Sequence, residues 1–141
     1  MTTGTLGVWD RRDPRQVVNT LKRTTNFNDT AIGSANGVNW DNYLPVGAFI
    51  TRVLTEIVTA FNAVTTNVYT VGSNLGVANN IVKAADVNPA LAGVYESTQA
   101  YGRALAATAV QLPASKYTQT GGAATAGQAI TVIEYEGGWA T

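Results

Sequence analysis

LPVGAFITRVLTEIVTAFNAVTTNVYTVG, residues 44–72, decides the fold of this 141-residue chain. Within it, the segment 48–60 consists mainly of Val, Ile, Leu, Phe and Thr, and its only charged residues are Arg52 and Glu56. These residue types favour a pleated, half-buried strand, and evenly spaced strands and turns are typical of a sandwich or a barrel. The stretch therefore predicts an all-β protein built around one long strand and a second strand that returns beside it.

The long strand candidate, 48–61, is apolar on both of its faces. One parity carries Phe49, Val53, Ile57 and Phe61, and the other carries Ile50, Leu54 and Val58. This pattern indicates burial on two sides, or a bulge that changes which parity faces inward partway along the strand. A helix over 50–61 is the alternative, because apolar residues also recur at every fourth position. We favour a strand, because β-branched residues dominate and Thr51, the one candidate N-cap, lies inside the run.

Shorter strands and turns come after the long strand. An Asn- and Thr-rich turn at 62–67 leads to a strand at 68–71 that ends at Gly72, which predicts a hairpin-like pair with the long strand. The segment 81–85 is short and apolar, and one or two further strands are expected at 94–95 and 101–110, of which the second is rich in Ala and also open to a helical interpretation. An all-β chain with short strands and Gly- and Asn-rich turns is typical of an antiparallel sandwich.

The last part of the chain is expected to consist of a connector followed by a strand. Small residues fill 115–127, which predicts a flexible connector, whereas 128–136 is the clearest alternating strand of the chain. In that strand Ala129, Thr131, Ile133 and Tyr135 share one face, and Gln128, Ile130, Val132 and Glu134 share the other. We expect the core of the sandwich to be built by Phe49, Val53, Ile57, Phe61, Ile130 and Val132.

Residues 1–42 differ in composition from the rest of the chain. They hold five of the nine basic residues, which are Arg11, Arg12, Arg15, Lys22 and Arg23, and they show no clean helical or strand period. We therefore expect a single domain with an extended N-terminal arm at 1–42 and an antiparallel, jelly-roll-like β-sandwich at 43–141. An ordered first strand followed by loops is the alternative for the arm.

Length and charge point to an associating protein. A chain of 141 residues suits one domain with one core. Nine basic and nine acidic residues cancel, and charged residues make up only 13% of the chain, against roughly 25% in soluble domains. A surface with so little charge repels its own copies weakly, so we expect an oligomer or a subunit of an assembly.

The sequence contains no cysteine and no histidine. Disulfides, cysteine nucleophiles, the usual zinc sites and Ser-His-Asp catalysis are therefore excluded. We expect no enzyme activity, no cofactor and no metal. The first fifteen residues lack an apolar core behind their basic residues, and no window approaches the roughly 20 apolar residues of a membrane helix, so we expect neither a signal peptide nor a membrane partner.

Three groups of residues have a chemical and a structural interpretation, and the structural one is favoured for each. Glu134 and Glu136 share a strand face and resemble a paired acid, but a solvated strand end accounts for them. The Gly-rich segments 33–37 and 72–76 lack the Lys and Ser or Thr of a phosphate loop, so turns account for them. The third group could supply oxygen ligands for a cation and consists of Asp41, Asn42, Asp86 and Asn88. Its spacing matches no calcium-binding loop, and Asx-turns use the same residue types.

The basic cluster of residues 1–42 is the candidate site. Arg and Lys beside Trp9 suit nucleic acid, because Arg neutralises phosphates and Trp stacks on bases. However, Asp10, Asp13 and Asp29 lower the net charge of residues 9–29 to about two, too little for phosphate-driven binding, so we expect no nucleic acid. We favour partner binding, in which Trp9 fills an apolar pocket and arginines pair with carboxylates, through Trp9, Arg11, Arg12, Arg15, Lys22 and Arg23. Packing of the segment on its own sandwich is the alternative.

A family resemblance rests on three pieces of the chain, which are LPVGAFITRV followed by TAFNAVTTNVYTVGSN, then VKAADVNP, and finally TAGQAITVIEYEGG. Their order resembles that of the decoration, or head cement, proteins of tailed bacteriophages, which are small jelly-roll-like β-sandwiches. The likeness covers about the last hundred residues and leaves the N-terminal arm uncovered. None of these motifs is chemically diagnostic, because any β-sandwich needs turn glycines and alternating apolar residues.

The resemblance implies a virion structural protein that is made in the host cytoplasm and binds the outside of the phage head. It implies the major capsid protein as partner, a homotrimer as the oligomer, and stabilisation of the capsid lattice as the function. The alternative is a module of a tail, fibre or baseplate that binds another virion protein, or a host glycan through exposed aromatic residues such as Tyr95, Tyr101 or Trp139.

Overall fold

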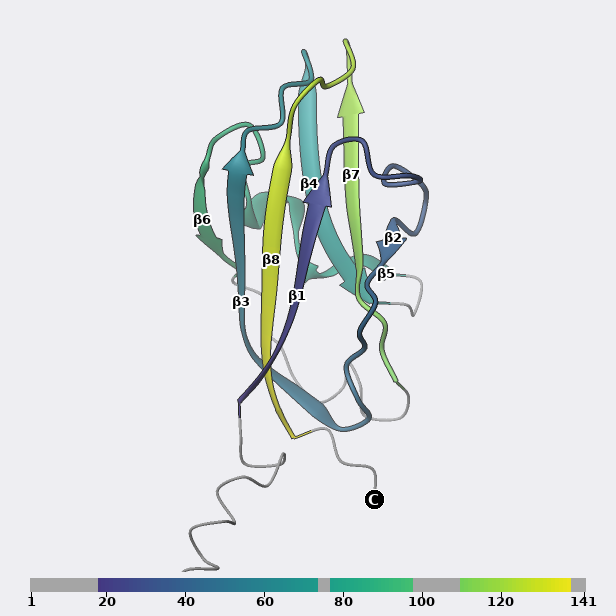
Figure 1. The fold of residues 1–141 in the computed structure, drawn as a ribbon, viewed down its shortest axis with the longest axis vertical. Coiled ribbons are helices and arrows are strands. Elements are labelled where there is room, and N and C mark those ends of the chain that lie inside the picture. The colour runs from purple at the N-terminus through teal and green to yellow at the C-terminus, as the bar shows by residue number, and fades with distance from the viewer. Residues whose placement is uncertain (1–17, 74–76, 98–109, 138–141) are drawn as a thin grey trace, which may run out of the picture.

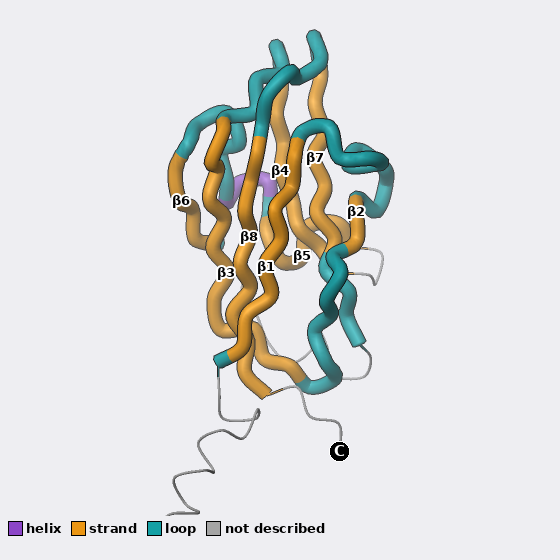
Figure 2. The backbone as a smooth tube through the Cα atoms, in the orientation of Figure 1, coloured by secondary structure: helices purple, strands orange, loops and turns teal. Residues whose placement is uncertain are grey.

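The computed structural model describes residues 18–73, 77–97 and 110–137, which form strands, loops and one short 3-10 helix (Figures 1 and 2). In chain order the elements are β1 Asn19–Asn26, β2 Val38–Asn39, β3 Ala48–Thr59, β4 Thr66–Ser73, β5 Val77–Val82, η2 Ala84–Asp86, β6 Gly93–Glu96, β7 Ala114–Thr120 and β8 Gln128–Gly137.

The strands form two four-stranded sheets that face each other (Figure 1). Sheet I has the order β1-β8-β3-β6 and sheet II has the order β2-β7-β4-β5, and every pairing is antiparallel. The pairing is nested, because β1 pairs with β8, β2 with β7, β3 with β6 and β4 with β5. The prediction of an all-β antiparallel sandwich is confirmed, and its jelly-roll-like detail stays a prediction.

The long strand β3 contains the bulge that the sequence pattern allowed. Its pairing with β8 shifts register between Ile50 and Arg52, so two successive residues lie on the exposed side. Before the bulge Ile50 is buried, and after it Val53 and Ile57 are buried. A bulge inserts one extra residue and thereby exchanges the parity that faces inward. The strand interpretation is confirmed, and the helical alternative for 50–61 is wrong.

The core lies between the sheets. Its largest fully buried side chains include Tyr69, Phe61, Leu44, Ile50, Ile57, Ile81 and Ile133. The ring of Phe61 lies 4.4 Å from that of Tyr117, centroid to centroid, so aromatic contacts close the end of the sandwich where β3 leaves sheet I. Burial confirms three predicted core residues, which are Val53, Ile57 and Phe61.

The other three predicted core residues are wrong. Phe49 precedes the bulge of β3 and is 44% exposed, because the bulge places its parity outside there. Ile130 and Val132 lie on the outer face of β8, and the smaller Ala129 and Thr131 face inward with no exposed surface. Small residues are needed inside because the large side chain of Tyr69 comes across from sheet II.

A chain of buried polar groups joins the two sheets. The Tyr69 hydroxyl lies 2.8 Å from Thr131 Oγ1 of sheet I and 3.3 Å from Ser115 Oγ of its own sheet. Trp40 Nε1 donates to Ser115 Oγ at 2.8 Å, and Thr131 Oγ1 lies 3.1 Å from Thr55 Oγ1. Satisfied polar groups in a low-dielectric interior fix one arrangement of their neighbours, so this network sets the register of one sheet on the other.

Residues 18–42 belong to the sandwich. Strand β1 pairs with β8 along its whole length, Trp40 is 3% exposed, and β2 pairs with β7 immediately after Gly37. Gly37 has φ 68°, and a Cβ there would run into the Ser115 carbonyl, so glycine lets the loop approach β7. The alternative of an ordered first strand therefore describes 18–42, and no boundary falls at residue 42. Residues 1–17 of the expected arm lie outside the described residues.

Two further predictions fail. The expected connector at 115–127 begins with β7, which pairs with β4 over seven positions, and only the loop after Thr120 remains. The hairpin-like pair of 48–61 with 68–71 is wrong, because β3 lies in sheet I and β4 in sheet II. The strand expected at 94–95 lies in β6, and nearly all of 101–110 lies outside the described residues. The short apolar segment 81–85 includes the last two residues of β5 and the first two of η2.

Candidate interaction surfaces

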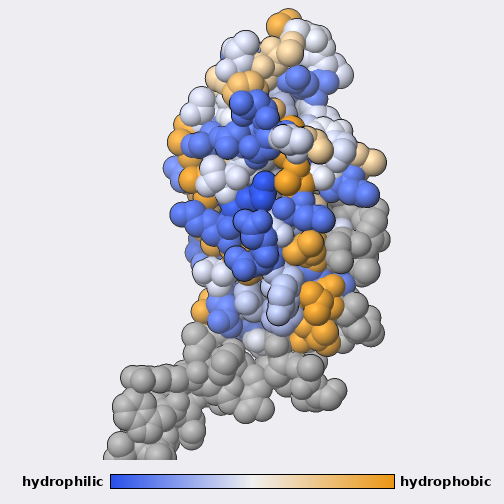
Figure 3. All heavy atoms as spheres, turned by 45° about the vertical axis from the view of Figure 1, so that its right-hand side comes forward, coloured by the Kyte–Doolittle hydropathy of each residue, from blue (hydrophilic) through white to orange (hydrophobic). Residues whose placement is uncertain are grey.

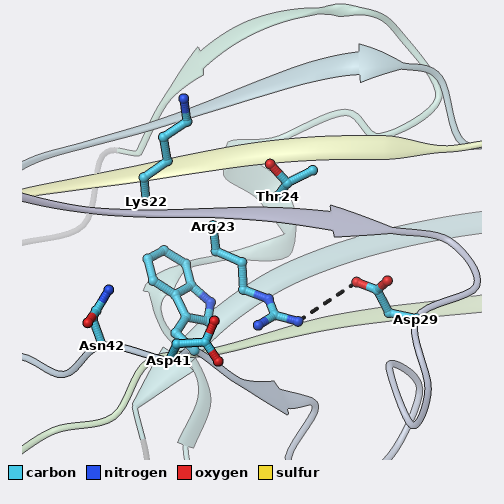
Figure 4. A pocket seen from close by; sticks show the side chains of 7 residues that line it. Lys22, Arg23, Thr24, Asp29, Asp41 and Asn42 are labelled. Carbon is cyan, nitrogen blue, oxygen red and sulfur yellow. Dashed lines mark ion pairs between the residues drawn. The ribbon is translucent and has the colours of Figure 1, made fainter.

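A polar hollow of about 250 Å³ lies at the edge of the sandwich where β1 faces β2. Its lining comprises Lys22, Arg23, Thr24, Asp29, Trp40, Asp41 and Asn42. Figure 4 shows Arg23 reaching toward Asp29 beside Asp41, while Lys22 leaves β1 on the opposite side. The adjacent positions of the two basic residues in a strand account for this, because successive side chains point to opposite faces.

The side chain of Arg23 connects the two sheets. Its Nη1 donates to the carbonyl of Asn39 in β2 at 3.1 Å, and its Nη2 lies 3.9 Å from Asp29 Oδ2. The Asp29 carboxylate also accepts the backbone N–H of Asn26 at 3.0 Å, which closes the turn after β1. The Nε of Arg23 is buried and has no hydrogen-bond partner among the described residues. These contacts give Arg23 a structural function at the sandwich edge.

The side of the molecule around this edge is largely hydrophilic, with smaller hydrophobic areas between the polar side chains (Figure 3). The indole of Trp40 forms the floor of the hollow and is anchored by its hydrogen bond to Ser115. Asp41 and Asn42 are exposed at its rim. The hollow therefore offers polar contacts but little apolar area to a partner.

The outer face of sheet I is different, because apolar side chains meet in its centre. A shallow hollow of about 290 Å³ is lined by Lys22, Leu54, Glu56, Val94, Ile130 and Val132. The register places Val132 between Lys22 and Leu54, and Leu54 next to Glu96. One row across the sheet therefore reads Lys22, Val132, Leu54, Glu96, with the cation at one edge and the carboxylate at the other.

The neighbouring rows place charged residues on the central strands β8 and β3, above and below this apolar centre. Glu134 lies opposite Arg52, and Arg52 Nε lies 3.4 Å from Glu96 Oε1. Val94 is 67% exposed at the β6 edge, next to Glu56. An apolar centre with a charged rim is the composition that protein interfaces use.

Aromatic residues line a third hollow near the beginning of β1. It has a volume of about 490 Å³ and is lined by Thr20, Leu21, Asn42, Tyr43, Pro45 and Tyr135. Burial, and secondarily the neighbouring Tyr43, raises the pKa of Tyr135 above its ordinary value. Of the aromatic residues considered for glycan binding, Tyr95 is partly buried and donates its hydroxyl to the Leu91 carbonyl at 2.9 Å, and Tyr101 and Trp139 lie outside the described residues.

Two of the acidic and amide residues that were considered as cation ligands make structural hydrogen bonds to the backbone. Asp86 Oδ2 accepts the backbone N–H of Lys83 at 3.0 Å, as in a capping box, and Asn88 Oδ1 accepts that of Ala90 at 3.1 Å, as in an Asx-turn. Glu134 and Glu136 alternate along the outer face of β8 near its end. Within 18–73, 77–97 and 110–137, no three acidic, His or Cys side chains gather as a metal site. Among the described residues, no helix has both the length and the apolar composition of a membrane span.

The structure places two of the six predicted partner-binding residues. Lys22 and Arg23 lie in β1 and point to opposite faces, so they do not form one cluster. Trp9, Arg11, Arg12 and Arg15 lie outside the described residues. The outer face of sheet I was not predicted from the sequence. The signal for it is that β8 is apolar on both faces, with Ile130 and Val132 on one and Ala129, Ile133 and Tyr135 on the other.

Comparisons with known proteins give one structural likeness. No protein-family model matches the chain, and no curated protein matches it. A chain in the acidic stable capsid structure of Helicobacter pylori bacteriophage KHP30 is similar, with a TM-score of 0.58 and 20% sequence identity. The similarity covers 84% of this chain and 86% of that chain. At this identity the likeness shows a shared fold.

Proposed function

We propose that this chain is a non-enzymatic structural protein of a phage virion, which binds the outside of the head and stabilises the capsid lattice. The observation that carries the proposal is the fold shared with a phage capsid chain over more than four fifths of both chains. The nested strand pairing supports it as well, because double-sheet jelly rolls are recurrent in viral capsid proteins. The decoration function itself rests on the family resemblance of the sequence.

Mass action supplies the mechanism. A protein that binds the assembled lattice and not its separate subunits stabilises the lattice by its own binding free energy. If the chain is a homotrimer, each copy adds a contact to the major capsid protein, and linked contacts multiply in affinity. Function therefore depends on shape and contact area, and no reacting side chain is required.

The proposed lattice contacts are made by the N-terminal segment. Trp9 inserts into an apolar pocket of the capsid protein, and Arg11, Arg12 and Arg15 pair with its carboxylates, because Trp and Arg dominate interface energies. Lys22 and Arg23 are less suited to this segment, since both belong to β1. The lattice-binding element then ends before Asn19.

The test adds purified chain to heads that lack it and measures co-sedimentation. We expect the full chain to saturate the heads and to raise the temperature at which they open. A chain without residues 1–17 keeps β1 and should fold normally but lose binding. Full-length chain that fails to bind heads would contradict the proposed function, whereas equal binding by the shortened chain would contradict only the assignment of the contacts.

A further inference from the structure

Two rows across the outer face of sheet I, those of Val132 and Glu134, are self-complementary in their charges. We propose that two copies of the chain pack these faces together around a two-fold axis that runs parallel to the strands. The central contacts are Val132 against Leu54 of the other copy, and the flanking contacts are Lys22 against Glu96 of the other copy. The proposal concerns self-association and does not rest on binding to a phage head.

The row across the sheet carries the argument. In the order β1, β8, β3, β6 it reads Lys22, Val132, Leu54, Glu96. A two-fold axis parallel to the strands, between β8 and β3, exchanges β1 with β6 and β8 with β3. Each cation then faces a carboxylate, and the two central apolar side chains face each other.

Of the two rows next to it, the row Thr24, Ile130, Glu56, Val94 places each Ile130 opposite a Glu56, whereas the row of Glu134 obeys the same charge symmetry. There Glu134 of β8 lies beside Arg52 of β3, so the exchange of β8 with β3 places each Arg52 opposite a Glu134. An axis in the plane of the sheet but perpendicular to the strands gives the opposite result, because it places Lys22 against Lys22 and Glu96 against Glu96. Like charges in contact are disfavoured, so the charge layout selects the parallel axis.

The composition and size of the face suit a weak contact between copies. The chain has no net charge, so whole-molecule repulsion between copies is small. Two sheets that pack face to face align within about 30° at a spacing of roughly 10 Å. Four strands give a face about 20 Å wide, which is at the small end for stable interfaces, so association should depend strongly on protein concentration.

Lys22 and Glu96 allow a clean test, because they lie on opposite edges of one sheet, about 14 Å apart by strand spacing, and do not touch within one copy. Sedimentation velocity over a range of concentrations is measured for the full chain, for Lys22→Glu and for Glu96→Lys. We expect each single variant to lower self-association by roughly tenfold or more, through two repulsive pairs in each two-copy contact. Lys83→Glu, a charge reversal at an exposed residue outside this face, should associate like the wild type.

Mixing the two single variants gives the decisive result. In a two-fold contact between Lys22→Glu and Glu96→Lys copies, both flanking pairs are again of opposite charge, so an equimolar mixture should regain association with one-to-one composition. If the chain also forms trimers, the two-fold contact joins trimers in pairs. The single variants should then separate these pairs, and the mixture should restore them. A wild type that shows no concentration-dependent association, single variants that associate like it, or a mixture that stays dissociated would each overturn the proposal.

Discussion

The outer faces of the two sheets are built from different side chains. On sheet II, the outer positions of β4 and β7 pair Thr66 with Thr120, Val68 with Thr118 and Thr70 with Lys116, and Thr66 Oγ1 lies 2.7 Å from Thr120 Oγ1. On sheet I, the centre of the outer face is formed by Leu54, Ile130 and Val132, with charges at both edges. Polar residues that pair with each other across two strands leave little apolar area for a partner. The difference teaches that the outer face of sheet I, more than that of sheet II, has the composition of an interface.

The largest expected effect separates the two faces of β8. Ile133→Ala removes a side chain with no exposed surface and should lower the free energy of unfolding by about 2–5 kcal/mol. Val132→Ala, its neighbour on the outer face, should cost under about 1 kcal/mol but should weaken self-association. Urea unfolding of both variants measures the first quantity, and sedimentation measures the second. Equal loss of stability in the two variants would contradict the inner and outer assignment.

The next effect concerns the polar contact between the sheets. Thr131→Val keeps the shape of the side chain but removes the hydroxyl that contacts Tyr69 and Thr55. We expect a loss of about 1–3 kcal/mol, because the buried Thr55 hydroxyl loses its contact and the Tyr69 hydroxyl keeps only the longer contact with Ser115. Thr118→Val, on the outer face of sheet II, is the matched control and should change stability by less than about 0.5 kcal/mol. If the two thermal unfolding midpoints shift alike, the network does not stabilise the sandwich.

A smaller, pH-dependent effect arises from Tyr117 on the inner side of sheet II. Burial raises the pKa of Tyr117 above its ordinary value of 10.0, so the folded state favours the neutral phenol. The resulting stability is complete below pH 10.0 and is lost as the pH rises through the raised pKa.

The variant Tyr117→Phe isolates this contribution. It should unfold with a shallower dependence on pH between about pH 9 and 11. A residual dependence is expected from Tyr135, whose pKa is also raised. Urea unfolding across this range, with identical slopes for variant and wild type, would show that Tyr117 is not responsible.

The smallest expected effect on stability lies at the rim of sheet I. Arg52 and Glu96 are about half exposed, with side-chain accessibilities of 48% and 58%, so their ion pair should contribute under about 1 kcal/mol. Arg52→Ala should therefore leave unfolding nearly unchanged and salt-insensitive, while it weakens association between copies at low salt. A stability loss comparable to that of Thr131→Val would show that the rim holds the fold and is not a free surface.

The sequence predicted what depends on local residue type and left out what depends on distant partners. Alternation predicted the strand at 128–136, and the double apolar pattern of 48–61 allowed the bulge in β3 as one of two interpretations. It did not predict which face of β8 is buried, because that choice depends on Tyr69 arriving from the other sheet. It likewise missed β7, whose polar residues pair with β4 only in the folded state.

The candidate site shows the same division. The basic residues of the N-terminal segment are visible in the sequence, but the rows of sheet I are not, since they require the register of four strands. Lys22 was named for its place in the basic cluster, which gave no sign that it lies across the sheet from Glu96. Pairing register is the information that one sequence does not contain.

The copy number of this chain in purified virions tests the central claim most directly. A protein that binds the repeating units of the capsid lattice is present in at least as many copies as there are binding positions on the head. Quantitative mass spectrometry against the major capsid protein should therefore find hundreds of copies per particle. Absence from virions, or a dozen copies or fewer, would contradict a lattice-stabilising function on the head.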